Sequence, residues 1–125
     1  TTNGTVKSNG ACVMGEGVAL QAKIRYPGLD MKIGEAIRNQ SNHLYMMGDL
    51  CTFPVKHSWW EKADLKLIRR SAEELADLAC EYPDLVFLLP RPGCGNGRLK
   101  WEDVKPVIEH ILPDNVIVVT RSCDG

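Results

Sequence analysis

The stretch that decides the fold is Pro90-Arg91-Pro92-Gly93-Cys94-Gly95-Asn96-Gly97-Arg98-Leu99-Lys100-Trp101. An apolar run of strand length, residues 85–89, precedes it, and an amphipathic run, residues 102–112, follows it. This order predicts a strand, a glycine-rich loop and a helix. Such a loop leaves backbone N–H groups free at a helix N-terminus, where the unpaired donors and the helix dipole favour an anion. We interpret the loop as a cradle for a diphosphate; the alternative is a turn that only joins strand to helix.

The standard phosphate-binding fingerprints do not fit this loop. No Lys-Ser or Lys-Thr follows the glycines, as a P-loop requires. Arg98 stands where the G-x-G-x-x-G pattern needs its third glycine, and Cys94 is too close to Arg98 in sequence for a cysteine phosphatase loop. Anion binding here must therefore rest on backbone groups.

Composition limits the class of protein. The 125 residues, of which 44% are hydrophobic, suffice for one globular domain over residues 1–125 but not for two. The net charge of −1 argues against broad binding to nucleic acid. Five cysteines without a C-x-x-C pair indicate a reducing cytoplasm, and the three histidines lack metal-ligand spacing. We expect a cytoplasmic domain with no metal, no other cofactor and no membrane-spanning segment.

The chain begins at Thr1-Thr2-Asn3, directly before a second glycine-rich loop over residues 4–17. Glycines in this loop allow the backbone to approach a ligand closely. Residues 18–26, which follow, are helical in composition and spacing. We expect the first strand or strands of the domain to lie upstream of this sequence. A homodimer in which a partner chain completes the sheet is one alternative.

The rest of the chain alternates between helices and strands. Helices are expected over residues 30–40, 63–81 and 102–112, a β-hairpin over 44–47 and 50–55, strands over 85–89 and 116–120, and a tail over 121–125. The run 85–89 is apolar throughout, which predicts a strand buried on both faces in the middle of a sheet. This order indicates an α/β fold with three layers, α/β/α, and a mixed sheet. Both glycine loops follow strands, where such sheets bind their ligands.

Several side chains near the loops have two interpretations. Cys94 is either a nucleophile or, more readily, a small buried cysteine, because no base accompanies it in the sequence. Trp59 and Trp60 either stack on a nucleobase or adenine, or one of them packs under the loop. His57 is an acid–base group or a surface residue. Arg98 either reaches a diphosphate or braces its own loop.

Four segments in this order resemble the macrodomain family: Thr2-Asn3, residues 12–20, Phe53-Pro54-Val55-Lys56 and residues 92–104. The resemblance covers nearly the whole chain. It is closest to the branch that contains the terminal ADP-ribose protein glycohydrolase and the antitoxin that removes ADP-ribose from DNA bases. It implies binding of ADP-ribose and hydrolysis of the bond between its distal ribose and an acceptor, which is a DNA base, a protein carboxylate or an acetyl ester. The alternative function is a non-catalytic ADP-ribose-binding module.

The resemblance also implies site residues. Lys56 stands at the position of the catalytic lysine, which acts on the anomeric carbon of the distal ribose by opening the ring or forming a covalent intermediate. On residue type alone Lys56 is an exposed lysine at a strand end, but a neutral amine in a desolvated pocket is a nucleophile. Asn3 is expected beside the distal ribose. The other expected ligand contacts are Asn9, Val13, Met14, Gly15, Gly17, Gly93, Cys94, Gly95, Asn96, Gly97 and Arg98.

The sequence departs from the glycohydrolase pattern at three places. That pattern has an Asp at the position of Gly97, so a mechanism with the lysine alone fits better. Asn9 replaces a serine of the first loop, and the aspartate that holds adenine in the family lies upstream of Thr2-Asn3. The Gly-Cys-Gly-Asn-Gly and Phe-Pro-x-Lys motifs favour the nucleic-acid branch, although the net charge offers little phosphate affinity. The expected partner is ADP-ribose or an ADP-ribosylated macromolecule, with a local contact to single-stranded DNA.

Overall fold

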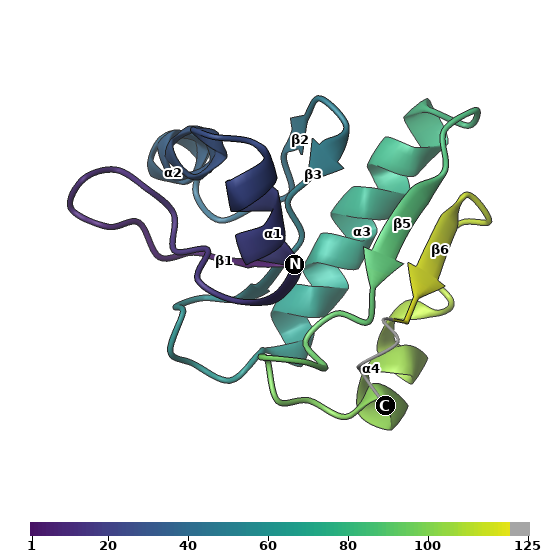
Figure 1. The fold of residues 1–125 in the computed structure, drawn as a ribbon. Helices are drawn as coiled ribbons and strands as arrows, with labels where there is room; N and C mark the ends of the chain where they lie inside the picture. The colour runs from purple at the N-terminus through teal and green to yellow at the C-terminus, as the bar shows by residue number, and fades with distance from the viewer. Residues whose placement is uncertain (121–125) are drawn as a thin grey trace.

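The computed structural model describes residues 1–120 and places helices on and around three short strand pairs (Figure 1). In chain order the elements are β1 (Thr2–Asn3), α1 (Gly17–Arg25), α2 (Leu29–Gln40), β2 (Met46–Met47), β3 (Leu50–Cys51), β4 (Pro54–Lys56), α3 (Leu65–Glu81), β5 (Phe87–Pro90), α4 (Trp101–Ile108) and β6 (Val116–Val119). The expected α/β class and the expected order of helices and strands are confirmed. The tail predicted over 121–125 lies outside the described residues.

The strands pair in both directions. β1 pairs with β4 and β5 pairs with β6 in parallel, whereas β2 and β3 form an antiparallel hairpin around Gly48-Asp49. Within residues 1–120 these pairs form three separate ladders instead of one continuous mixed sheet. The strand expected over residues 50–55 is divided into β3 and β4. The two segments differ in partner, since β3 belongs to the hairpin and β4 to the ladder with β1.

Helix α3 organises the larger hydrophobic core. The side chain of Asp64 caps its N-terminus by accepting a hydrogen bond of 3.0 Å from the Lys66 amide. The buried face of α3 packs against β4, β5, β6 and α4, and the core contains Phe53, Val55, Ile68, Ala72, Leu75, Ala79, Leu89, Val104, Ile108 and Val116. Buried Ser71 donates a hydrogen bond of 2.6 Å to the Pro54 carbonyl. This bond ties α3 to the strand that carries Lys56.

A second, smaller core lies under the first glycine loop. Cys12, Met14, Leu29 and Ile33 form its buried cluster, and they join that loop to α2. The loop crosses α2 at Gly34, where an added Cβ would lie 1.9 Å from the Gly10 carbonyl oxygen. Only glycine fits such a crossing. The first loop is therefore held by α2, and the second loop by α3.

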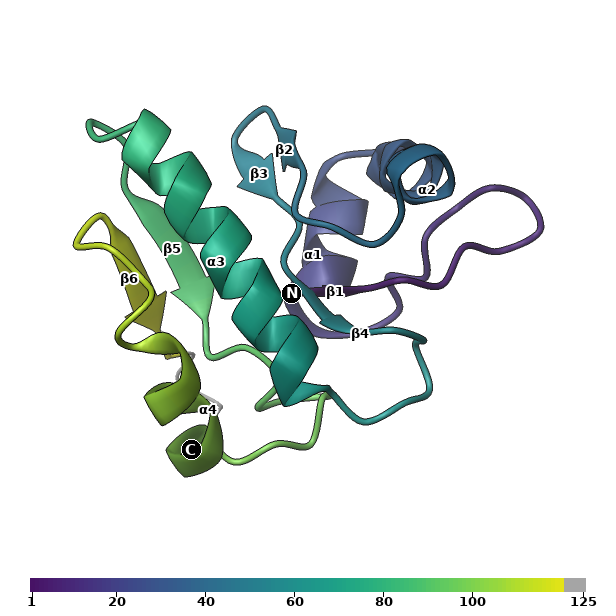
Figure 2. The same ribbon diagram turned by 180° about the vertical axis from the view of Figure 1, so that it is seen from behind.

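Strand β5 is buried on one face only, so the prediction of a strand buried on both faces is wrong for the described chain. Leu89 is 4% exposed, whereas Leu88 is 67% exposed. Figures 1 and 2 show α3 on one side of β5 and β6. The outer side also carries exposed Val86 and Ile117. A continuous apolar run does not reveal whether layers cover both faces. No helix within residues 1–120 has the length and apolarity needed to cross a membrane.

Candidate active site

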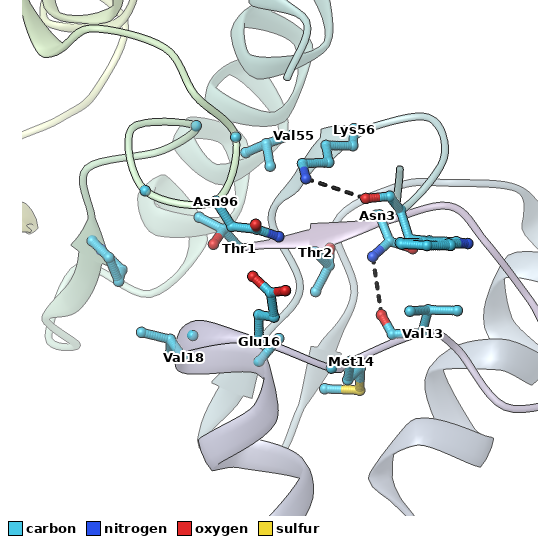
Figure 3. Close-up of a pocket in the computed structure, with 18 of the residues that line it drawn as sticks. Thr1, Thr2, Asn3, Val13, Met14, Glu16, Val18, Val55, Lys56 and Asn96 are labelled. Atoms are coloured by element: carbon cyan, nitrogen blue, oxygen red, sulfur yellow. Dashed lines mark hydrogen bonds between the residues drawn. The ribbon is translucent and has the colours of Figure 1, made fainter. Parts of the chain in front are cut away.

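The two glycine loops face each other across a cleft of about 880 Å³ (Figure 3). The cleft brings together most of the residues that the sequence predicted for the site, namely Asn3, Val13, Met14, Gly15, Gly17, Lys56, Gly93, Cys94, Gly95, Asn96 and Gly97. Asn9 and Arg98 are not part of its lining. Asn9 instead accepts a hydrogen bond of 3.0 Å from the Ala11 amide and shapes the outer part of its own loop.

Asn3 braces the first loop. Its side-chain amide donates to the Val13 carbonyl at 3.0 Å and its side-chain oxygen accepts from the Thr5 amide at 3.0 Å. Helix α1 then begins at Gly17, where φ is +62°, and no side chain caps this N-terminus. The first backbone N–H groups of a helix have no partner within the helix. The loop therefore presents an uncapped, positively polarised helix end to the cleft.

Two glycines of the second loop, Gly93 and Gly97, have no room for a side chain. An added Cβ at Gly93 would lie 2.8 Å from Cδ1 of Ile68, and one at Gly97 would lie 2.5 Å from the Gly93 carbonyl oxygen. The Gly97 carbonyl accepts from the Ala63 amide at 3.0 Å, next to the start of α3. The aspartate of the glycohydrolase pattern therefore does not fit here without a shift of the backbone. Arg98 follows in the left-handed region, with φ of +65°.

Lys56 ends β4 inside the cleft. It is 6% exposed, so the interpretation as an exposed lysine at a strand end is wrong. Its Nζ donates a hydrogen bond of 3.3 Å to the Trp59 carbonyl, and Figure 3 shows the side chain reaching toward this acceptor. Burial lowers the pKa of Lys56 below the ordinary 10.5, the charge of Arg98 lowers it further, and Glu16 acts in the opposite direction. The neutral amine therefore forms more readily here than on an exposed lysine.

The remaining candidates differ in position. His57 lies outside the cleft lining and contacts Asp64 at 2.8 Å, as expected of a surface histidine. Trp59 lines the cleft and is 54% exposed, Trp60 is 66% exposed, and neither is packed under the loop. Burial raises the pKa of the Cys94 thiol, against the opposite effect of the Arg91 charge, and so disfavours the thiolate that a nucleophile needs. Within residues 1–120 no group of three or more His, Cys, Asp or Glu side chains is placed to hold a metal.

The chain is similar in sequence to known glycohydrolases. No family model matches the chain. The DNA ADP-ribosyl glycohydrolase of Mycobacterium tuberculosis is 31% identical over 104 residues, which are 74% of this chain and 30% of that protein. The protein of the same name from Thermus aquaticus is 31% identical over 114 residues, 80% of this chain and 31% of its own. The chain thus spans about a third of these relatives. ADP-ribose glycohydrolase OARD1 of Bos taurus is 26% identical over 117 residues, 87% of this chain and 73% of its own.

Solved structures agree in fold. The macrodomain of Mycobacterium tuberculosis DarG superposes with a TM-score of 0.70 at 28% identity, covering 86% of this chain and 80% of that one. The macrodomain of Thermus aquaticus DarG superposes with a TM-score of 0.71 at 29% identity, covering 97% and 87%. The chain belongs to the macrodomain family. The resemblance and the macrodomain fold predicted from the sequence are confirmed.

Among the residues of this macrodomain's cleft that were not singled out from the sequence are Arg91, Trp101 and Glu16. Arg91 and Trp101 both line the cleft, and the guanidinium of Arg91 lies 4.9 Å from the centroid of the Trp101 ring. Glu16 lines it from the N-terminus of α1. Glu16 lies between Gly15 and Gly17, which the sequence had already assigned to the ligand, and this adjacency was the available signal for its position.

Proposed function

We propose that this macrodomain binds ADP-ribose and hydrolyses the bond between its distal ribose and an acceptor, with Lys56 as the catalytic group. The observation that carries the proposal is a buried lysine of lowered pKa in a cleft between two glycine loops. A lysine used only to neutralise a phosphate needs its charge, and burial works against that charge. The same burial favours the neutral amine that nucleophilic chemistry needs.

The diphosphate of ADP-ribose matches the chemistry of the two loops. The uncapped N-terminus of α1 supplies backbone donors and the positive end of the helix dipole. Gly15, Gly17 and Gly95 have open space where a Cβ would stand, so a ligand can approach the backbone there. With the diphosphate between the loops, the distal ribose is directed toward Lys56 and Asn3, which line the same cleft.

Lys56 acts on the anomeric carbon of the distal ribose in this proposal. In direct displacement, its neutral Nζ attacks that carbon, the acceptor leaves with the electron pair of its bond, and a covalent intermediate forms. In the ring-opening alternative, the bond from the anomeric carbon to the ring oxygen breaks first, the ring oxygen takes that electron pair and a proton, and the acceptor leaves afterwards from the opened sugar. The hydrogen bond from Nζ to the Trp59 carbonyl orients the amine before attack.

A DNA base is the acceptor that we favour. Two of the relatives are named DNA ADP-ribosyl glycohydrolases. The loop after Lys56 exposes two indoles, Trp59 and Trp60, and a base that adjoins the modified nucleotide in single-stranded DNA stacks readily on such rings. We place this activity in the cytoplasm, since Cys12, Cys51, Cys80 and Cys94 are free thiols. The homodimer expected from the sequence stays a prediction. Light scattering after size exclusion tests it by measuring the molar mass of the protein in solution.

The test is the release of free ADP-ribose from ADP-ribosylated single-stranded DNA, from glutamate-modified protein and from O-acetyl-ADP-ribose. We expect the wild type to act on the DNA. Lys56→Ala should lose at least about 10³-fold in turnover while keeping its affinity for ADP-ribose by calorimetry. Lys62→Ala, which removes an exposed lysine of the same loop, is the matched control and should behave as wild type. Release from protein or ester alone would contradict the DNA acceptor, and activity in Lys56→Ala would contradict the role of the lysine.

A non-catalytic ADP-ribose reader is the second candidate. It is favoured by Gly97, which leaves the second loop without a carboxylate. In a reader, none of the three substrates releases ADP-ribose, and Lys56→Ala weakens the binding of ADP-ribose. These results are opposite to those expected of the hydrolase, so one set of proteins distinguishes the two functions.

A further inference from the structure

Glu16 is the one carboxylate among the described residues that line the cleft. The cationic side chains of the lining are Lys7, Lys56 and Arg91. A carboxylate is unexpected beside a loop that would hold a diphosphate, because the two negative charges repel. The presence of Glu16 therefore weakens ligand binding, and its position calls for another explanation.

Glu16 does not serve the helix that it precedes. It occupies the N-cap position of α1 with extended backbone, φ of −146° and ψ of +159°, yet its side chain makes no capping hydrogen bond. An N-cap side chain that stabilises its helix turns back onto the backbone of the first turn. Figure 3 shows the Glu16 carboxylate directed instead into the cleft, toward Thr1 and Asn96. Helix stability therefore does not explain this carboxylate.

We propose that Glu16 is the acid–base residue of the hydrolysis and carries protons between Lys56, the acceptor and water. This inference rests on the function proposed above. The carboxylate that the second loop lacks at Gly97 would then come from the first loop. The site would then hold one carboxylate, from the first loop, and one lysine, from β4, around the anomeric carbon.

The proton balance of the two steps defines the role of Glu16. In the first step, neutral Nζ of Lys56 bonds to the anomeric carbon and the bond to the acceptor breaks. Glu16 takes one proton from the resulting ammonium and gives it to the departing acceptor. In the second step, Glu16 takes a proton from water as the water oxygen bonds to the anomeric carbon. The bond to Nζ breaks, Nζ receives that proton, and free ADP-ribose and the neutral lysine remain.

The electrostatics of Lys56 agree with this placement. Glu16 raises the pKa of Lys56, against the effects of burial and Arg98, so its charge is felt at the amine. Both groups line the cleft, so their charges can interact across it. Glu35, an exposed carboxylate on α2 outside the cleft, provides the matched control.

The experiment compares wild type, Glu16→Gln, Glu16→Asp and Glu35→Gln in the release assay and in ADP-ribose titrations. We expect Glu16→Gln to lose at least about 10²-fold in kcat and to bind ADP-ribose more tightly, because the repelling charge is gone. Glu16→Asp should recover at least about ten-fold of that loss, and Glu35→Gln should match wild type.

Each other outcome overturns the inference in a different way. A wild type that releases ADP-ribose and a Glu16→Gln variant with kcat within three-fold of it would refute the role of Glu16 and leave the hydrolase intact. Parallel losses of kcat, affinity and melting temperature in Glu16→Gln would show a structural role instead. A wild type that binds ADP-ribose but releases none would overturn the proposed function and, with it, the acid–base role.

Discussion

Lys56 links local packing to reactivity. It ends a strand of three buried residues, so its ammonium lacks most of the water that would solvate it. Its pKa lies below 10.5 because of burial and of Arg98. We expect kcat/KM to rise with pH as the amine loses its proton and to level off above the lowered pKa, so the midpoint of the rise should lie below 10.5. A midpoint at or above 10.5 would contradict a desolvated lysine.

Two variants check that this rise belongs to Lys56. Arg98→Gly removes a positive neighbour and also suits the φ of +65°, so the fold should tolerate it. Without that charge the pKa of Lys56 should increase, and the rise should move to higher pH. Lys56→Arg keeps the charge but cannot deprotonate in this range, so it should be inactive at every pH.

Gly97 offers a test of packing at the same scale. A Cβ there would lie 2.5 Å from the Gly93 carbonyl oxygen and 2.8 Å from Cβ of Ala63, whereas one at Gly95 would meet nothing within 4 Å. Gly97→Ala should therefore cost about 1–3 kcal/mol in the free energy of unfolding, as overpacking does. Gly95→Ala, two residues away in the same loop, should change it by less than about 0.5 kcal/mol. Chemical denaturation measures both, and equal effects would contradict the packing argument.

At the scale of elements, the contact between α3 and β4 sets the position of the lysine. Ser71 is fully buried and donates 2.6 Å to the Pro54 carbonyl, at the start of the strand that ends in Lys56. Ser71→Ala removes the donor and leaves a buried acceptor without it, which should cost about 1–3 kcal/mol. Because β4 then loosens, turnover should fall as well. Urea unfolding and the release assay measure the two effects, with exposed Ser8→Ala as the control. Unchanged stability in Ser71→Ala would show that β4 is held by other contacts.

Elements whose signal is local were predictable, and properties that depend on other elements were not. The hairpin at Gly48-Asp49 and the long helix α3 follow from turn residues and helical spacing within one short segment. The exposure of Leu88 did not follow, because it depends on which layer covers β5. The orientation of Glu16 could not be predicted either, since an N-cap side chain can turn to its own helix or away from it. The glycine pattern of both loops predicted the cleft, because a backbone that a ligand approaches closely has no room for side chains and so requires glycine.

For the whole molecule, the cleft lies between two cores. One wall rests on the cluster of Met14, Leu29 and Ile33 under the first loop. The other wall rests through Gly93 on Ile68 of α3 and on Ala63, which precedes that helix. The β1–β4 ladder passes between them and carries Asn3 and Lys56. A ligand that contacts both loops would therefore join the two cores as well as fill the cleft.

This arrangement predicts that ADP-ribose stabilises the entire described fold. A ligand that binds only the folded state at 100 times its dissociation constant contributes about 2.7 kcal/mol, which for a domain of this size raises the melting temperature by several degrees. The protein should still unfold in a single transition, shifted to higher temperature, because the ligand contacts both loops and each loop rests on one of the cores. AMP is the matched control: it lacks the second phosphate and the distal ribose and so cannot bridge the loops, and it should produce a much smaller shift. Equal shifts with both nucleotides would place the ligand at a single wall and contradict a cleft built to hold a diphosphate between two glycine loops.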